Sequence, residues 1–120
     1  MLFARDKGLE IERRVCRHLE KHGLRLVERN YLCKGGEIDL IMRDNKTLVF
    51  IEVRFRKTVT YGSALESVDK KKQNKIIHAA QHFLQSTASS NVACRFDVVA
   101  VSPDNSSLKI DWVQDAFQLN

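Results

Sequence analysis

Residues 35–56 read GGEIDLIMRDNKTLVFIEVRFR, and this stretch decides the fold that the sequence predicts. Its two apolar runs, residues 37–43 and 47–56, have the length and the β-branched content of strands. The Asp44-Asn45 pair between them is typical of a tight turn. We therefore expect the two runs to form an antiparallel hairpin.

Further helices and strands flank this hairpin along the chain. Apolar periodicity predicts helices over residues 6–22 and 69–85, and strands over residues 24–33, 92–101 and 108–112. The long connection through the second helix allows a right-handed crossover, which would make the third and fourth strands parallel. The expected fold class is α/β, with a mixed central sheet flanked by helices in a single domain over residues 1–120.

Two carboxylates on the hairpin are predicted to face each other. With residues 44–47 as the loop, Arg43 pairs with Leu48. Counting back along both strands then places Asp39 opposite Glu52, with their Cβ atoms about 5.5 Å apart. Like charges in that arrangement destabilise a sheet, and Mg²⁺ would remove the repulsion because it takes hard oxygen ligands. The pairing therefore predicts a metal site.

Arg54 follows Glu52 by two residues and so lies on the same face of its strand. Its guanidinium could hydrogen-bond a phosphate and stabilise the charge that develops during phosphoryl transfer. An acid and a base that alternate along an exposed strand are also typical of a solvated ion-pair ladder. Asp39 favours the metal site, because it interrupts residues 38–42, a run too apolar for an exposed edge.

Two polar residues on the predicted helices are further candidates for this site. Glu12 lies near the buried edge of the first helix, where it could reach the metal through water or remain a solvated side chain. Gln73 precedes the apolar stripe of the second helix. Its amide could lie at the phosphate or end that stripe at the surface, and the sequence leaves both alternatives open.

The chain has 20 Lys and Arg against 15 Asp and Glu, which gives a formal net charge of +5. This excess is modest, but basic residues gather in and after the hairpin: Arg54, Arg56, Lys70, Lys71, Lys72 and Lys75. Beside a carboxylate site we expect them to contact the phosphates of a nucleic acid, although a solvated helix face is the alternative.

Composition also bears on location. No run approaches the ~18 consecutive apolar residues of a membrane span. Charged residues stand at positions 5–7, where a signal peptide would need an apolar run. The three cysteines are odd in number and widely spaced, as expected of buried thiols rather than a zinc site. We expect a cytoplasmic protein without a membrane partner.

The hairpin motifs resemble those of a known family. GEIDLI at residues 36–41 and FIEVR at residues 50–54 are similar to the signature of the YraN family of small bacterial proteins. The resemblance extends to Gly8 with Glu12, to KKQNK at residues 71–75 and to RFDVVAV over residues 95–101, and so covers nearly the whole chain. That family belongs to the PD-(D/E)xK nuclease-like superfamily and resembles archaeal Holliday junction resolvases.

The resemblance implies a restriction-endonuclease-like αβββαβ core, which is also the element order that the periodicity predicts. It implies that Asp39 and Glu52 ligate a metal together with the Val53 carbonyl. Glu12 would then support the metal, and Gln73 would lie beside the site. One departure concerns Arg54, because the superfamily motif ends in Lys at this position. Arginine stays protonated and cannot act as a general base, although it can hold a phosphate.

The residues and the resemblance together lead to a first functional hypothesis. The chain would be an endonuclease dependent on Mg²⁺ (or Mn²⁺) that hydrolyses phosphodiesters in structured or branched DNA. Water activated at Asp39 and Glu52 would attack the phosphodiester, and Arg54 would stabilise the transition state. The basic helix and Arg56 would position the backbone. A homodimer would suit a reaction that needs two cuts.

Two other classes of function remain open. A non-catalytic nucleic-acid-binding module could keep the nuclease fold, and Arg54 in place of Lys favours it. A structural partner protein could instead meet an acidic protein through its basic helix. The first alternative predicts salt-sensitive DNA binding without cleavage, and the second predicts no DNA binding at moderate salt.

Overall fold

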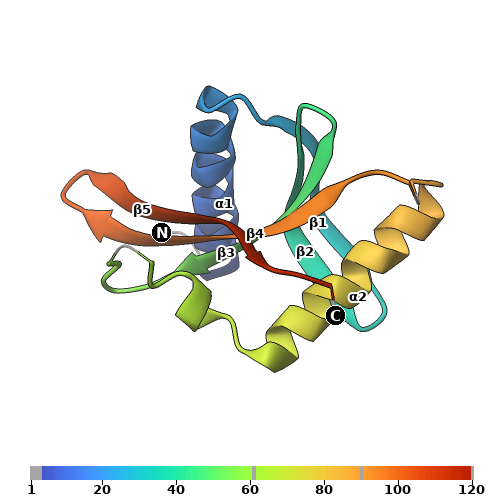
Figure 1. Cartoon of the computed structure of the whole chain (residues 1–120). Coiled ribbons are helices and arrows are strands. Elements are labelled where there is room, and N and C mark those ends of the chain that lie inside the picture. The colour runs from blue at the N-terminus through green and yellow to red at the C-terminus, as the bar shows by residue number, and fades with distance from the viewer. Residues whose placement is uncertain (1–3, 61, 90, 120) are drawn as a thin grey trace.

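The computed structural model of the chain describes residues 4–60, 62–89 and 91–119. Its described elements form a five-stranded mixed sheet with a long helix on each face (Figure 1). Their order is α1 (Ala4–Lys21), β1 (Arg25–Cys33), β2 (Gly36–Asp44), β3 (Thr47–Phe55), the short helix η1 (Leu65–Ser67), α2 (Lys70–Ser86), β4 (Cys94–Asp104) and β5 (Ser107–Phe117). The strands follow one another across the sheet in chain order. The predicted α/β class is therefore confirmed, and the architecture is compatible with a restriction-endonuclease-like core.

The β2–β3 hairpin has the predicted register, because Arg43 pairs with Leu48. Its loop is shorter than the expected four residues, since Asp44 and Thr47 also pair. Asn45 adopts φ of 55°, a left-handed conformation that asparagine tolerates better than most residues. Shortening a loop by one residue on each side leaves the register unchanged, so the predicted alignment of the two strands holds.

The crossover from β3 through α2 to β4 makes these two strands parallel, as predicted. α2 begins after Asp69, whose carboxylate accepts a hydrogen bond from the Lys72 amide at 2.8 Å. The helix then passes very close to β2 at Gly36, where an added Cβ would lie 2.4 Å from the Lys75 carbonyl oxygen. This contact fixes the basic N-terminal part of α2 against the hairpin.

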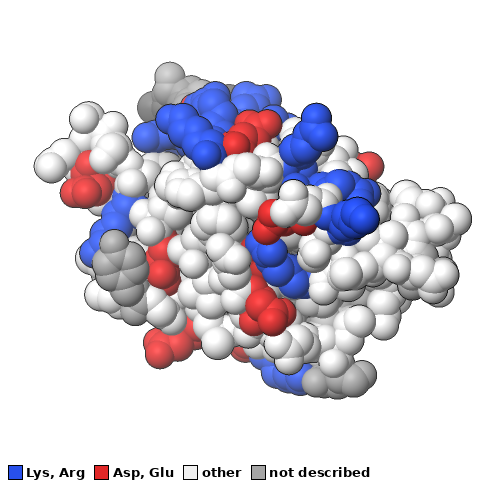
Figure 2. Space-filling view, turned by 45° about the horizontal axis from the view of Figure 1, so that its top comes forward, with Lys and Arg blue, Asp and Glu red and all other residues white. Residues whose placement is uncertain are grey.

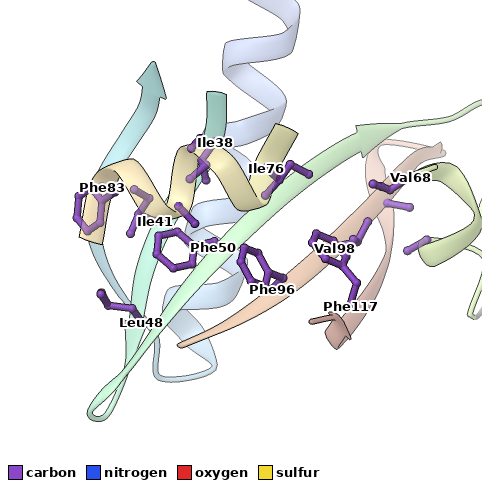
Figure 3. Packing of buried hydrophobic residues seen from close by; sticks show 14 of the residues in the cluster. Ile38, Ile41, Leu48, Phe50, Val68, Ile76, Phe83, Phe96, Val98 and Phe117 are labelled. Carbon is purple, nitrogen blue, oxygen red and sulfur yellow. The ribbon is translucent and has the colours of Figure 1, made fainter. Parts of the chain in front are cut away.

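The sheet is buried on both faces. α1 packs one face through residues that include Val15 and Leu19, together with Val49 and Ile51 of β3. Its outer side is basic, and Figure 2 shows Lys and Arg side chains gathered on the surface over this helix. On the other face, Phe50 lies between α2 and β4 and contacts the rings of two more phenylalanines (Figure 3). Because both faces are covered, Glu52 in β3 is almost completely enclosed.

The β4–β5 hairpin extends further than the sequence predicted at both strands. β5 continues to Phe117, although the expected strand ended at residue 112. The buried carboxylate of Asp97 holds this extension, because it accepts hydrogen bonds from the Trp112 indole and the Asp115 amide, each at 2.9 Å. These contacts join residues 15 or more positions apart, so local periodicity does not contain them. Among the described residues, no helix is long and apolar enough to cross a membrane.

Candidate metal and phosphate site

Asp39 lies where the β2–β3 ladder opens. The last described pair of that ladder is Leu40 with Ile51, and Asp39 follows it towards the start of β2. Its carboxylate oxygen Oδ2 accepts a hydrogen bond from the Val53 amide at 2.8 Å. The side chain therefore reaches β3 beside Glu52, although the predicted pair of Asp39 with Glu52 is not part of the described ladder.

The same contact fixes the direction of the Val53 carbonyl. In an extended strand the amide and the carbonyl of one residue point to the same neighbouring strand. Because the Val53 amide points at Asp39, the Val53 carbonyl leaves β3 on the side of the Asp39 carboxylate. A carboxylate oxygen and a main-chain carbonyl oxygen are both ligands that Mg²⁺ accepts.

Glu52 is the most enclosed acid of this site, with only 4% of its surface exposed. Burial and the charge of Asp39 raise the pKa of Glu52 to about 8, against the opposing effect of two cations. These cations are the Lys72 ammonium, 3.6 Å from Glu52 Oε2, and the Arg54 guanidinium, 3.5 Å from the same oxygen. The Glu52 carboxyl thus binds a proton more readily than an ordinary glutamate, and a divalent cation would compete with that proton.

Glu12 brings a third carboxyl from α1. Burial, followed by the charges of Asp39 and Glu37, raises the pKa of Glu12 to about 7. Its oxygen Oε1 is buried without a hydrogen-bond partner in the described part of the chain. A buried acceptor without a partner is costly, and it indicates a place where a ligand or an ordered water completes the site.

These oxygens fit a hard divalent cation. Within residues 4–60, 62–89 and 91–119, no three Asp, Glu, His or Cys side chains lie close enough to enclose a metal by themselves. Mg²⁺ does not need such an enclosure, because it usually takes one or two carboxylates and completes its shell with water and substrate phosphate. Asp39, Glu52 and the Val53 carbonyl would hold it, and the unpaired oxygen of Glu12 could receive one of its waters.

A basic pocket of about 300 Å³ adjoins the carboxylates. Its lining comes from β3, from the end of η1 and from the first turns of α2: Arg54, Ser67, Asp69, Lys71, Lys72 and Lys75. Two of these residues, Arg54 and Lys72, also contact Glu52. The structure therefore brings four of the six predicted phosphate-binding residues together beside the predicted metal site.

Comparison with known protein families identifies the family of this chain. The model of the "Uncharacterised protein family UPF0102" matches residues 11–101. The chain belongs to the UPF0102 family, also known as YraN. A UPF0102 protein of Nitrosococcus oceani is 48% identical over 116 residues, which are 96% of this chain and 94% of the relative. One of Stutzerimonas stutzeri is 45% identical over 119 residues, 98% of this chain and 99% of the relative.

Two predicted nucleic-acid contacts of this UPF0102 protein lie outside the basic pocket. Arg56 donates a hydrogen bond to the Ser67 carbonyl at 3.4 Å and lines a neighbouring hollow. Lys70, the first residue of α2, is exposed and does not line the basic pocket. Both can still reach a long polyanion that covers the pocket, so their role stays a prediction.

Gln73 is engaged elsewhere in the UPF0102 chain. Its side-chain amide donates a hydrogen bond to the Val68 carbonyl at 3.1 Å, and its main-chain amide donates to the Asp69 carbonyl. The side chain thus holds the start of α2, and its described hydrogen bond is to the main chain of Val68 rather than to Asp39 or Glu52. A contact with substrate remains a prediction for this residue.

Lys72 has a contact that sequence reasoning did not foresee. The sequence placed it among the phosphate-binding lysines, whereas the structure shows it paired with Glu52. Nothing in the local pattern separates it from Lys70 and Lys71, which precede it in the same run. Only the crossover, which lays the start of α2 over β3, brings this one ammonium to the carboxylate.

Proposed function

We propose that this UPF0102 protein is a Mg²⁺-dependent endonuclease that hydrolyses phosphodiesters in structured or branched DNA. One observation carries the proposal. Asp39 and the buried Glu52 meet at the open end of a hairpin, and Arg54 and Lys72 contact Glu52 from the side of a basic pocket. Paired carboxylates beside clustered cations suit a metal ion and a phosphate bound together.

The carboxylates and the main chain would hold the cation. Asp39 is oriented by the hydrogen bond that its Oδ2 accepts from the Val53 amide, and its carboxylate would serve as a ligand. Glu52 would lose its proton when the cation binds, because a divalent charge outweighs the cost of burial. Bound Mg²⁺ would supply Lewis-acid polarisation of a phosphoryl oxygen and a bound water of lowered pKa.

Arg54 and Lys72 would together take the role of the single lysine in the superfamily motif. Arg54 keeps its charge and presents a planar donor set, which suits a phosphate oxygen. Lys72 would bring a second cation to the reacting region, and its ammonium already lies 3.6 Å from Glu52. On this proposal, Lys72 of α2 would take the role of the lysine that the superfamily motif has on β3.

The basic pocket suits recognition of DNA shape. Its lysines would contact backbone phosphates, which carry no direct sequence information. Asp69 also lines this pocket and caps α2 through the Lys72 amide, but three lysines and Arg54 outweigh its single negative charge. Resolution of a branched junction needs two cuts, so a homodimer with two such sites is part of the proposal.

The test is cleavage of a labelled four-way junction by Asp39→Asn and by a matched variant, Glu37→Gln. We expect Asp39→Asn to lose at least about 100-fold in rate with Mg²⁺, because it removes a ligand charge, yet to bind DNA normally in chelator. Glu37 is exposed on the same strand, so Glu37→Gln should cut nearly as well as the unmodified protein. Unchanged cleavage by Asp39→Asn would refute the mechanism.

The second candidate is a nucleic-acid-binding module without catalysis. The ion pairs of Arg54 and Lys72 with Glu52 favour it, because two cations could satisfy this carboxylate in place of a metal. Salt-sensitive binding of all substrates, with no product in either Mg²⁺ or Mn²⁺, would establish this alternative.

A further inference from the structure

A groove runs between α1 and the β4–β5 hairpin, on the face of the sheet opposite α2. In Figure 1 this hairpin extends to the left beside α1, while α2 lies at the lower right. Two hollows of about 330 and 280 Å³ make up the groove. They share Arg14, Ser107 and Leu108 as lining residues, so they lie next to each other.

One end of the groove is basic. Arg14, Arg17 and Lys21 follow one another at spacings of three and four residues and therefore lie on one side of α1. His18 lies between them, and Ser107 and the start of β5 form the opposite wall. Lys and Arg gather over α1 on the outer surface as well (Figure 2). This end offers positive charge along about two helical turns.

The other end presents an aromatic ring. Phe55, the last residue of β3, is 44% exposed and lines this end of the groove. The Lys7 ammonium lies 5.1 Å from the centre of its ring. Glu10 is the acid in this part of the groove, and its carboxylate pairs with exposed Arg17 at 3.9 Å. So long a contact between exposed side chains is weak, so Arg17 can turn to another anion.

We propose that this groove binds a single-stranded segment of DNA. Its phosphates would follow Arg14, Arg17 and Lys21, and one base would stack on Phe55. Proteins that bind single strands combine a basic groove with exposed aromatic rings in this way, because every base has a face that can stack. A duplex has no free base face to offer Phe55, so the ring selects for unpaired DNA.

The proposal rests on the proposed function and narrows its substrate. Phe55 stands three residues after Glu52 on β3, about 10 Å along the strand. The Phe55 side chain lies on the opposite face of the sheet from Glu52, so a strand that leaves the groove at Phe55 would pass round the end of β3 to reach the carboxylate site. The substrate class that fits is branched DNA with an unpaired arm, whose single strand lies in the groove while its junction lies at the carboxylates.

The test is the affinity for a fluorescent oligothymidine of about 12 nucleotides, measured by anisotropy in chelator over a range of salt. Arg17→Ala/Lys21→Ala removes two groove cations. Arg13→Ala/Arg25→Ala removes the same charge from exposed positions that do not line the groove. We expect the groove variant to bind at least about 10-fold more weakly and its salt slope to fall by about 1.4. The control should lose about twofold or less.

Phe55 is tested in the same assay. Phe55→Leu keeps an apolar side chain but removes the stacking face, and it should weaken binding of the oligothymidine by about fivefold or more. Phe55→Tyr keeps an aromatic ring and should bind the oligothymidine about as tightly as the unmodified protein. Affinity for a blunt duplex should not respond to either substitution. Equal losses in the groove and control double variants, or unchanged binding by Phe55→Leu, would overturn the proposal.

Cleavage is scored separately, so the two proposals can fail independently. Groove-dependent binding of single strands by a protein that cuts no branched DNA would reject the endonuclease and keep the groove. The protein could instead cut junctions while its binding of single strands does not depend on Arg17, Lys21 and Phe55. That result would reject the groove and keep the endonuclease. Thermal unfolding of each variant confirms that these surface substitutions leave the fold intact.

Discussion

At the scale of single residues, the main result is the difference between Lys72 and its neighbours. Three consecutive lysines open α2, but only Lys72 is shown in contact with a site carboxylate, at 3.6 Å from Glu52. An ammonium at this point lowers the cost of a negative charge on Glu52 and can also meet a phosphate. Lys72 therefore belongs to the site, whereas Lys70 belongs to the surface around it.

This difference predicts unequal effects of the same substitution at two positions. Lys72→Met should lower the rate of junction cleavage by about 100-fold or more, because it removes an ammonium from the reacting region. Lys70→Met removes the same charge from an exposed position and should cost about threefold or less. The measurement is single-turnover cleavage with protein in excess. Equal effects of the two variants would remove Lys72 from the reaction.

Arg54 and Glu52 show how much of the site the local sequence pattern predicts. The alternation along β3 correctly predicted that they share a face, and the structure places their charged groups 3.5 Å apart. The pattern could not decide between an ion-pair ladder and a metal site, because that depends on burial. Glu52 is buried on a sheet face that α2 covers, and this long-range packing weakens the case for a solvated ladder.

At the scale of elements, the position of α2 depends on Gly36. The helix passes so close to β2 that a Cβ on Gly36 would meet the Lys75 carbonyl at 2.4 Å. Main chain cannot move aside as a flexible side chain can, so the whole helix would have to shift. Since α2 carries Lys72, this close approach also sets the distance between the lysine and Glu52.

We therefore expect Gly36→Ala to destabilise the fold by about 1–3 kcal/mol. Gly8→Ala is the matched control, because nothing lies within 4 Å of a Cβ added there. In a helix, alanine is favoured over glycine by up to about 1 kcal/mol, so Gly8→Ala should leave stability unchanged or raise it. Urea unfolding followed by circular dichroism measures both. A Gly36→Ala protein as stable as the original would show that α2 is not held as closely as the structure shows.

The elements also show where prediction from sequence ends. Apolar periodicity found both helices and all five strands in their correct order, and turn residues fixed the hairpin register. The extension of β5 was missed, because it depends on the hydrogen bonds of Asp97 to the Trp112 indole and the Asp115 amide. Contacts that join distant parts of the chain leave no mark on local periodicity.

At the scale of the whole molecule, the two faces of the sheet carry different charged surfaces. α2 lays a basic pocket against the carboxylates, while α1 and the β4–β5 hairpin form the groove that ends at Phe55. The hairpin pattern predicted the first surface in outline. It could not predict the groove, because the groove residues come from α1, β3 and β5 and meet only in the folded chain.

The central claim is that the carboxylates form a metal site, and binding of Mg²⁺ tests it most directly. Titration calorimetry should detect Mg²⁺ binding that strengthens as pH rises from about 6 to 8.5. The sign follows from the pKa values: Glu12 at about 7 and Glu52 at about 8 hold protons at the lower pH, and the cation must displace them. Binding should therefore release protons, seen as a dependence of the heat on the buffer.

The same titration is repeated with Asp39→Asn as the test variant and Glu37→Gln as its control. The account predicts that Asp39→Asn weakens Mg²⁺ binding by at least about 10-fold, since it removes a ligand charge, and that exposed Glu37→Gln binds almost as tightly as the unmodified protein. Mg²⁺ binding that is independent of pH and equal in Asp39→Asn and the unmodified protein would contradict the account.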